Sequence, residues 1–287
     1  MIDLFVPSKN RAMQLRFLLE SVAENMPSFF NEIKILYTYT DDNFKKGYEK
    51  LINEKILPNL VWQKEEDFLQ DFLQCIESCK SDYICGMVDD CVVYKRVSVP
   101  SEIVEELIDD EILCFSLRLG LNTELQNYLK SKSWKVKLKK YRENEIGIKW
   151  NYSDYIDRCN YGYPISLDGH IYRPKDLLKF STKVEFDSLR SWEKNTTDSC
   201  FTDESAKKHM ASFKQSILFS IPCNCVQYDE TMSSGEVYSY TEEELNKRYL
   251  NNEVISFWDM QHAFQNVNCT HNEVKFYFKK LQGEENA

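Results

Sequence analysis

The sequence predicts an α/β fold, in which a mixed, mostly parallel, Rossmann-like sheet is flanked by helices and followed by a small helical C-terminal extension. Two observations support this prediction. Residues 1–95 alternate short apolar runs with helical patterns four times, as consecutive βαβ units do. Residues 241–252 have helical spacing and begin with Thr241 followed by Glu244, a capping signal. Because βαβ crossovers are right-handed, the first 95 residues should form a doubly wound parallel sheet.

Four segments in this first part have the apolar or β-branched composition of buried strands. They are residues 2–7, 33–40, 57–63 and 81–90. The segments between them have helical spacing and cover residues 8–25, 41–51 and 65–80. In the last of these, Phe68, Phe72, Cys75 and Ile76 recur three or four residues apart, which places them on one face of a helix.

The second part of the chain has a less regular pattern. The expected strands are residues 111–122, 165–173 and 218–227. The expected helices are residues 100–109, 174–180, 184–192 and 241–252. A basic run at residues 135–142 suits either a solvated helix face or a patch for phosphate or lipid headgroups.

Composition narrows the classes of function. The chain has 287 residues, 43% of them apolar, which is enough for a sizeable core. A net charge of −10 counts against a general nucleic-acid binder. The sequence shows no leader-like segment and no apolar run long enough to span a membrane, so we expect a cytoplasmic protein. Ten cysteines without a C-x-x-C spacing agree with reduced thiols in that compartment.

Polar residues follow three of the predicted strands where each strand ends. These are Pro7-Ser8, Thr40-Asp41 and Asp89-Asp90, and in a parallel sheet they should meet at one edge, where such folds bind ligands. The adjacent carboxylates Asp89 and Asp90 repel each other. They suit a divalent cation, hydrogen bonds to ribose hydroxyls, or the capping of the next turn.

The segments VPSKNRAMQL (6–15) and MVDD (87–90) together resemble glycosyltransferases of the GT-A type, in the family-2-like group that uses nucleoside diphosphate sugars. The resemblance implies a nucleotide-binding half at about 1–120, an acceptor half at about 121–235 and the extension at 236–287. It also implies nucleotide-binding residues, which are Pro7, Ser8, Asn10, Arg11, Thr40, Asp41, Asp89 and Arg118. A Mn²⁺ or Mg²⁺ ion would be held by Asp89, Asp90 and His170, although one carboxylate of the strict D-x-D or D-D-D pattern is absent from Val88-Asp89-Asp90-Cys91.

Blocks in the second half extend the resemblance: FSLRLG (115–120), GYPISLDGHIYR (162–173) and PCNCVQ (222–227). An inverting enzyme of this kind needs a general base near the acceptor hydroxyl. The candidates are Asp187, Glu185 and Asp168, and position along the chain favours Asp187. Arg118 suits a phosphate contact or a buried ion pair equally well.

The implied function is transfer of a sugar from a nucleoside diphosphate sugar to a glycan or glycolipid acceptor, as in polysaccharide biosynthesis, with peripheral membrane contact. Two alternatives remain. A sugar nucleotidyltransferase would share the nucleotide-binding half, but its Gly-rich loop is absent from VPSKNRAMQ. A non-catalytic domain that kept the fold would bind nucleotide sugars without turnover.

Overall fold

A computed structural model describes residues 1–97, 100–129, 132–155, 159–225 and 234–281. Its centre is a sheet of nine strands in the order β3-β2-β1-β4-β11-β6-β12-β10-β9. The parallel half comprises β1 (Ile2–Lys9), β2 (Ile33–Thr38), β3 (Leu60–Lys64) and β4 (Tyr83–Gly86). This half confirms the four strands predicted from the first 95 residues.

The other half of the sheet is mixed. It comprises β6 (Ile112–Ser116), β9 (Arg142–Glu143), β10 (Gly147–Asn151), β11 (His170–Tyr172) and β12 (His209–Phe213). β11 is antiparallel to both of its neighbours, β4 and β6, and β10 is antiparallel to β12 and β9. The other strands of the large sheet therefore all run in one direction, and the predicted fold class is confirmed.

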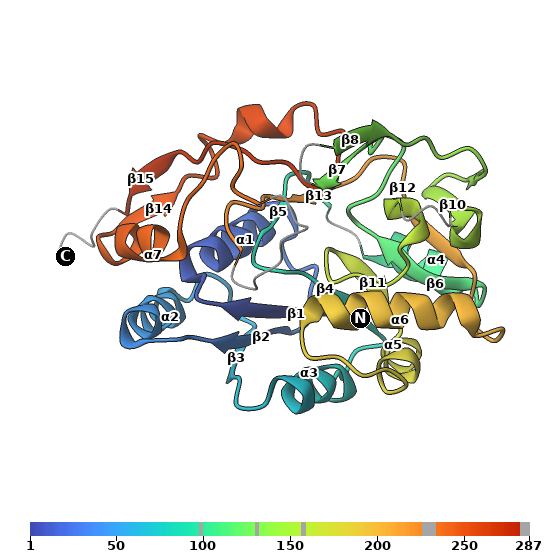
Figure 1. Cartoon of the computed structure of the whole chain (residues 1–287), viewed down its shortest axis with the longest axis horizontal. Coiled ribbons are helices and arrows are strands. Elements are labelled where there is room, and N and C mark those ends of the chain that lie inside the picture. The colour runs from blue at the N-terminus through green and yellow to red at the C-terminus, as the bar shows by residue number, and fades with distance from the viewer. Residues whose placement is uncertain (98–99, 130–131, 156–158, 226–233, 282–287) are drawn as a thin grey trace.

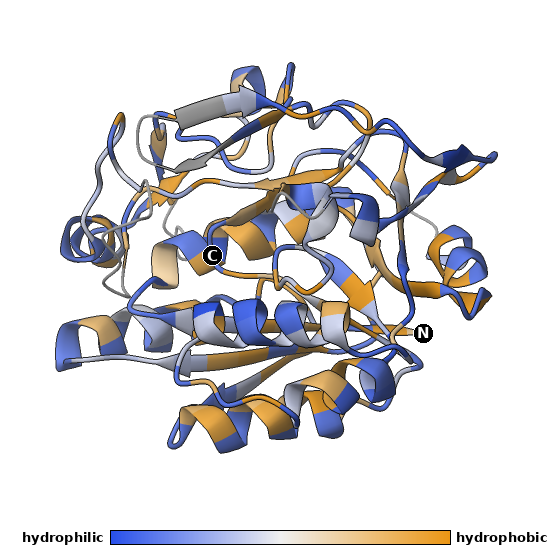
Figure 2. Ribbon diagram, turned by 45° about the vertical axis from the view of Figure 1, so that its right-hand side comes forward, coloured by the Kyte–Doolittle hydropathy of each residue, from blue (hydrophilic) through white to orange (hydrophobic). Residues whose placement is uncertain are grey.

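Helices cover both faces of the sheet (Figure 1). They are α1 (Ala12–Asn25), α2 (Asp42–Glu54), α3 (Phe68–Glu77), α4 (Ser101–Ile108), α5 (Pro174–Ser181) and α6 (Leu189–Thr202). One apolar core joins the sheet to α1, α2 and α4, and a second joins it to α3, α5 and α6. Figure 2 shows the strands as largely apolar ribbons between helices that turn polar surfaces outward.

Two short strands form a separate pair beyond the carboxyl end of β4. β5 (Cys91–Val93) follows Asp90 directly and pairs with β13 (Leu218–Ser220). A separate hairpin is formed by β7 (Leu125–Leu129) and β8 (Lys132–Lys135). Short 3-10 turns lie at Tyr152–Tyr155 and Asn160–Gly162.

The C-terminal extension contains the predicted helix, α7 (Glu242–Leu250), whose N-cap is Thr241. It also contains a two-stranded sheet of β14 (Glu253–Ile255) and β15 (Phe278–Lys280), with a 3-10 turn at Gln261–Phe264. Its apolar residues join the same core as α1 and α2, including Tyr249, Phe257 and Phe276. The extension therefore packs on the larger domain rather than standing apart from it.

Several predicted boundaries were wrong. The helix expected at 184–192 begins only at Leu189, because Ser188 caps it with its hydroxyl. The strand expected at 165–173 begins only at His170. The basic run at 135–142 is not helical, since it leaves β8 and crosses to β9 as irregular backbone. None of the helices in the described ranges combines the length and apolarity needed to cross a bilayer.

Candidate active site

The end of β1 and the turn after β4 meet at one edge of the sheet, as the sequence predicts. Pro7 is buried within β1 and pairs with Leu36 of β2. One residue later, Ser8 Oγ donates a hydrogen bond of 2.7 Å to Asp89 Oδ2. Ser8 Oγ also lies 2.8 Å from the hydroxyl of Tyr48 on α2, and because the serine proton is engaged by Asp89, Tyr48 is the donor in that bond.

Arg11 provides the positive charge that offsets the two carboxylates. Its Nη1 lies 3.0 Å from Asp89 Oδ1 and 3.0 Å from Asp90 Oδ1. Its Nη2 donates to the backbone carbonyl of Asn224 at 2.6 Å. The guanidinium is nearly buried, with 8% of the side chain exposed. Arg11 therefore links three segments: the turn after β1, the turn after β4 and the segment after β13.

The loop after β2 reaches the same edge. Asn10 has a positive φ of 59° and exchanges two hydrogen bonds with Thr40, through Nδ2 to Oγ1 at 3.0 Å and from Thr40 N to Oδ1 at 2.9 Å. Asp41 instead caps α2, accepting from the backbone N–H groups of Asn43 and Phe44. The three sequence segments predicted to converge are therefore brought together, and Asn10 links two of them.

A second charged cluster lies beside the first. Asp168, in the turn before β11, forms a buried ion pair with Arg118, and His271 Nε2 lies 3.3 Å from Asp168 Oδ2. Arg118 also donates to Asn160 Oδ1 at 3.3 Å. Burial alone would raise the pKa of Asp168, but Arg118 and His271 hold it well below its usual range. Asp168 is therefore a carboxylate at neutral pH.

The charges of the two clusters interact. Burial raises the pKa of Asp90 to about 7, Arg11 opposes the rise, and the nearby carboxylates Asp89 and Asp168 add to it. Burial likewise raises the pKa of Asp89, against the effect of Arg11 and Ser8. The site therefore has more acidic groups than its two arginines neutralise, which is the electrostatic condition that favours binding of a cation.

Glu193 on α6 is a site residue that the sequence analysis missed. Its Oε1 accepts hydrogen bonds from Ser166 Oγ at 3.0 Å and from the backbone N–H of Leu167 at 2.7 Å. Burial and the charge of Asp168 raise the pKa of Glu193 to about 7. The signal was present in the helical period, because Glu193 shares a face with the buried residues Thr196 and Cys200.

His170 lies under the site, in the sheet. Its side chain is fully buried, and Nδ1 lies 3.2 Å from the hydroxyl of Tyr172. Burial, together with the charge of Arg118, lowers the pKa of His170 to about 3, so the imidazole is neutral. A neutral imidazole is competent as a ligand, but its role as a metal ligand stays a prediction.

Glu185 and Asp187 lie on exposed backbone before α6. Asp187 accepts a hydrogen bond of 2.8 Å from Ser191 Oγ, which lowers its pKa. The backbone carbonyl of Glu185 accepts from Asn195. The structure therefore gives Asp187 a local bond next to the helix cap, and it does not bring either carboxylate into a described hydrogen bond with the Asp89 or Asp168 clusters.

Asp89 and Asp90 are hard oxygen donors of the type that Mg²⁺ and Mn²⁺ prefer. In the described part of the chain, however, no three His, Cys, Asp or Glu side chains are grouped as a metal cluster. The residues therefore fit a cation that takes most of its remaining ligands from a bound phosphate and water, as Mg²⁺ commonly does.

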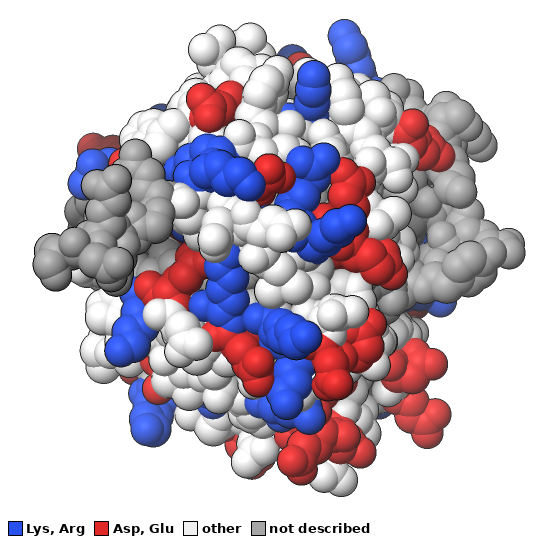
Figure 3. Space-filling view, turned by 90° about the vertical axis from the view of Figure 1, so that its left-hand side faces the viewer, with Lys and Arg blue, Asp and Glu red and all other residues white. Residues whose placement is uncertain are grey.

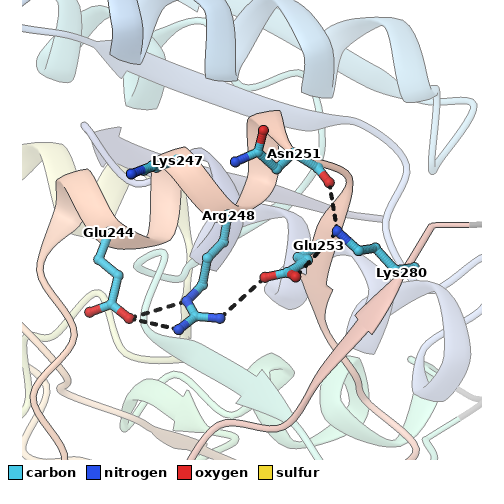
Figure 4. Close-up of a pocket in the computed structure, with 6 residues that line it drawn as sticks. All are labelled: Glu244, Lys247, Arg248, Asn251, Glu253 and Lys280. Atoms are coloured by element: carbon cyan, nitrogen blue, oxygen red, sulfur yellow. Dashed lines mark hydrogen bonds and ion pairs between the residues drawn. The ribbon is translucent and has the colours of Figure 1, made fainter.

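A separate surface hollow of about 520 Å³ lies on the C-terminal extension (Figure 4). Most of its charged groups pair with one another: Arg248 with Glu244 and Glu253, and Lys280 with Glu253. The nearby side of the molecule interleaves acidic and basic side chains (Figure 3). We attach no function to this hollow.

Comparison with known proteins adds a sequence match. No protein-family model matches the chain. The chain is 24% identical over 186 residues to the bifunctional glycosyltransferase pgtA of Dictyostelium discoideum, a match that covers 59% of this chain and 23% of pgtA. The chain therefore spans less than a quarter of the length of this curated relative.

Two solved structures show a limited likeness. TarS 1-349 of S. aureus, in complex with UDP, has 14% identity and a TM-score of 0.48, over 76% of this chain and 60% of that chain. The mannosyltransferase PcManGT from Pyrobaculum calidifontis, in complex with GDP-Man and Mn²⁺, has 11% identity and a TM-score of 0.42, over 75% of this chain and 54% of that chain.

The fold and the charged edge define an α/β protein whose charged residues meet at the carboxyl ends of its parallel strands, the edge at which such sheets bind ligands. The sequence match to pgtA confirms the resemblance to glycosyltransferases that the segments VPSKNRAMQL and MVDD indicate.

Proposed function

We propose that this chain is a glycosyltransferase that moves a sugar from a nucleoside diphosphate sugar to a hydroxyl group of a glycan or glycolipid. The observation that carries the proposal is the meeting of Ser8, Arg11, Asp89 and Asp90 at the carboxyl ends of β1 and β4. This edge is where doubly wound sheets bind nucleotides. The match to pgtA supports the reaction class.

The donor would lie across this edge. Asn10 and Thr40 belong to the loops that would surround the base and ribose, with Asp41 capping the adjacent helix. Arg11 and Arg118 are the cations nearest to the carboxylate clusters, and a guanidinium binds phosphate oxygens in a bidentate manner. Negative charge that develops on the leaving diphosphate would be stabilised by these groups.

A Mn²⁺ or Mg²⁺ ion is part of the proposal. Asp90, with Asp89, would hold it, and when bound it would supply positive charge to the leaving diphosphate. The excess of acidic groups over arginines at the site supports this assignment. PcManGT, a similar chain, is in complex with Mn²⁺.

An inverting reaction requires a general base. Asp168, Glu185 and Asp187 stay candidates, and Glu193 joins them. A base works best when its pKa lies near the operating pH, and of these groups Glu193 has a pKa raised to about 7. We therefore propose Glu193 as the base, with Asp168 held as a fixed charge by Arg118 and His271.

The cellular setting of the reaction is also part of the proposal. Cysteines of the core such as Cys85, Cys114 and Cys200 are thiols, which agrees with a cytoplasmic location. Interleaved charges on the face in Figure 3 give no broad basic surface for nucleic acid there. Peripheral contact with a membrane and a role in polysaccharide biosynthesis stay part of the proposal, as does the division into donor and acceptor halves.

The test is a binding and transfer screen. Thermal shifts would be measured with UDP, GDP, ADP, CDP and dTDP and their common sugars, with and without Mn²⁺. A ligand at a hundredfold excess over its dissociation constant should stabilise the fold by about 2.7 kcal/mol. Sugar transfer to a glycan or glycolipid panel should then follow. Binding without any transfer would favour a non-catalytic domain, and release of pyrophosphate from a nucleoside triphosphate with a sugar phosphate would favour a nucleotidyltransferase.

A further inference from the structure

The guanidinium of Arg11 occupies the position between the two carboxylates that a metal ion would need. Nη1 is 3.0 Å from an oxygen of Asp89 and 3.0 Å from an oxygen of Asp90. The other oxygen of Asp89 is taken by Ser8 at 2.7 Å. Asp89 therefore has a protein donor on each oxygen, and its side chain is only 5% exposed.

A divalent cation and this arginine compete for the same carboxylate oxygens. Mg²⁺ binds oxygen directly at about 2.0–2.1 Å, so a carboxylate oxygen must turn its lone pair toward the ion. At that separation the dication would also face the Arg11 charge across a poorly screened site, where repulsion is strong. Binding of a cation between the two carboxylates is therefore disfavoured while Arg11 stays in place.

One hydrogen-bond donor of the Arg11 side chain has no partner in this arrangement. Its Nε is buried and has no hydrogen-bond partner among the described residues. A buried donor without a partner is unfavourable, so this arrangement leaves part of the guanidinium unsatisfied. A diphosphate offers several charged acceptors, and the planar guanidinium binds such groups through two parallel bonds.

We propose that Arg11 and a divalent cation are alternative partners of the Asp89–Asp90 pair, and that a bound diphosphate draws Arg11 away and so admits the cation. The proposal rests on the proposed function, which supplies the diphosphate. By linkage, the cation and the diphosphate must then strengthen each other's binding by the same factor. Without nucleotide, Arg11 acts as an internal counter-ion that keeps the pair closed.

The test measures Mn²⁺ binding without any nucleotide, by the loss of the electron paramagnetic resonance signal of free Mn²⁺. The variant Arg11→Gln should bind Mn²⁺ at least tenfold more tightly than the wild type, because it opens the carboxylate pair. Arg16→Gln is the matched control. Arg16 is also a buried arginine on α1, and it pairs with Glu20 at 2.8 Å and Glu54 at 2.7 Å instead. Its removal should leave Mn²⁺ binding at the site unchanged.

The second arm adds UDP or GDP, whichever binds more tightly, with protein-free blanks to correct for Mn²⁺ held by the nucleotide alone. The wild type should gain at least tenfold in Mn²⁺ affinity, and Arg11→Gln should gain much less. Equal Mn²⁺ affinities of nucleotide-free wild type and Arg11→Gln would overturn the proposal. If Arg11→Gln does not fold, the wild type alone decides, since a Mn²⁺ affinity that the nucleotide leaves unchanged also overturns it.

The two proposals fail in different ways. Absence of binding by any nucleoside diphosphate or nucleotide sugar contradicts the glycosyltransferase function. The nucleotide-free comparison of Arg11→Gln with wild type still decides whether Arg11 excludes the cation. Tight nucleotide binding with equal Mn²⁺ affinities leaves the function intact and rejects the role of Arg11.

Discussion

His271 Nε2 lies 3.3 Å from Asp168 Oδ2, so the C-terminal extension places a side chain in the charged centre of the larger domain. The neighbouring residue Thr270 is buried and accepts a hydrogen bond of 2.8 Å from Asn160 Nδ2. The backbone carbonyl of Thr270 accepts from the N–H of Ser220 in β13. The extension is therefore part of the site as well as of the core.

Deleting residues 236–287 should prevent folding of the remaining chain. The extension buries Tyr249, Phe257 and Phe276 against the core shared with α1 and α2. Burial of one such side chain contributes about 1.5–3 kcal/mol. Loss of several exceeds much of the 5–15 kcal/mol that a typical domain has in total. Circular dichroism and urea unfolding would measure the result, with a chain ending at Leu281 as the control. A truncated chain that unfolds cooperatively near the native midpoint contradicts this prediction.

Asp89→Asn and Asp90→Asn should differ in stability although both weaken Mn²⁺-dependent binding of a nucleoside diphosphate. Asp89 accepts hydrogen bonds from Ser8 and Arg11. The variant Asp89→Asn leaves the buried charge of Arg11 with a weaker partner, which should lower the free energy of unfolding by about 1–3 kcal/mol. The buried surroundings of Asp90 disfavour its charged form. At pH 8 the variant Asp90→Asn should therefore leave the free energy of unfolding unchanged or raise it. Urea unfolding and calorimetric titration would measure both effects. Unchanged nucleotide affinity in both variants, with Mn²⁺ present, rejects a metal role for the pair.

The free energy of unfolding should fall as the pH rises from about 4 to about 7. Burial raises the pKa values of Asp90 and Glu193 in the folded protein to about 7, from ordinary values of 3.8 and 4.5. A group whose pKa is raised on folding binds its proton more tightly in the folded state. Its stabilising effect is therefore complete below the pKa of the unfolded chain and is lost as the pH rises through the pKa of the folded protein. The loss should be on the order of 1–3 kcal/mol for each group.

Urea unfolding at pH 5 and at pH 7.5 would measure this dependence. Glu193→Gln and Asp90→Asn should each flatten it. Asp187→Asn is the control, since the pKa of Asp187 is lowered by its bond to Ser191 and its removal should not flatten the curve. A wild type that becomes more stable over this interval, with no change in either variant, contradicts the assignment of the raised pKa values.

The parts of the structure that depend on local pattern were predictable from the sequence. Strands β1 to β4 follow from apolar runs, and their shared direction places Ser8 and Asp89 at one edge, as expected. The partner of the acidic pair was not predictable, because Arg11 was assigned to the nucleotide by resemblance and its ion pairs arise from the turn after β1.

Two site residues were missed for physical reasons. The helix α6 was expected at residues 184–192, and with that start Glu185 and Asp187 lie in its first turn. The observed helix starts after the Ser188 cap and continues to Thr202, so it includes Glu193, which lies beyond the end of the expected helix. His271 reaches Asp168 through a tertiary contact across most of the chain, and no local pattern encodes such a contact.

The last prediction concerns the catalytic base. Four carboxyl groups were considered: Asp168, Glu185, Asp187 and Glu193. Position along the chain favours Asp187, whereas environment favours Glu193, whose carboxyl group is held by Leu167 and Ser166 and has a pKa of about 7. Asp168, with its pKa held low by Arg118 and His271, is a weak base.

The amide variants Asp168→Asn, Glu185→Gln, Asp187→Asn and Glu193→Gln would be compared for donor affinity and for transfer rate. Glu193→Gln should bind the donor as the wild type does and lose about 10²–10⁴ in transfer rate. The pH–rate profile gives a second readout, because the rise of the wild-type rate near pH 7 should disappear in this variant. Glu185→Gln and Asp187→Asn should keep near-native rates. A large loss in Asp187→Asn together with an active Glu193→Gln would restore the sequence-based assignment, and near-native rates in all four would indicate retention of configuration or a base elsewhere.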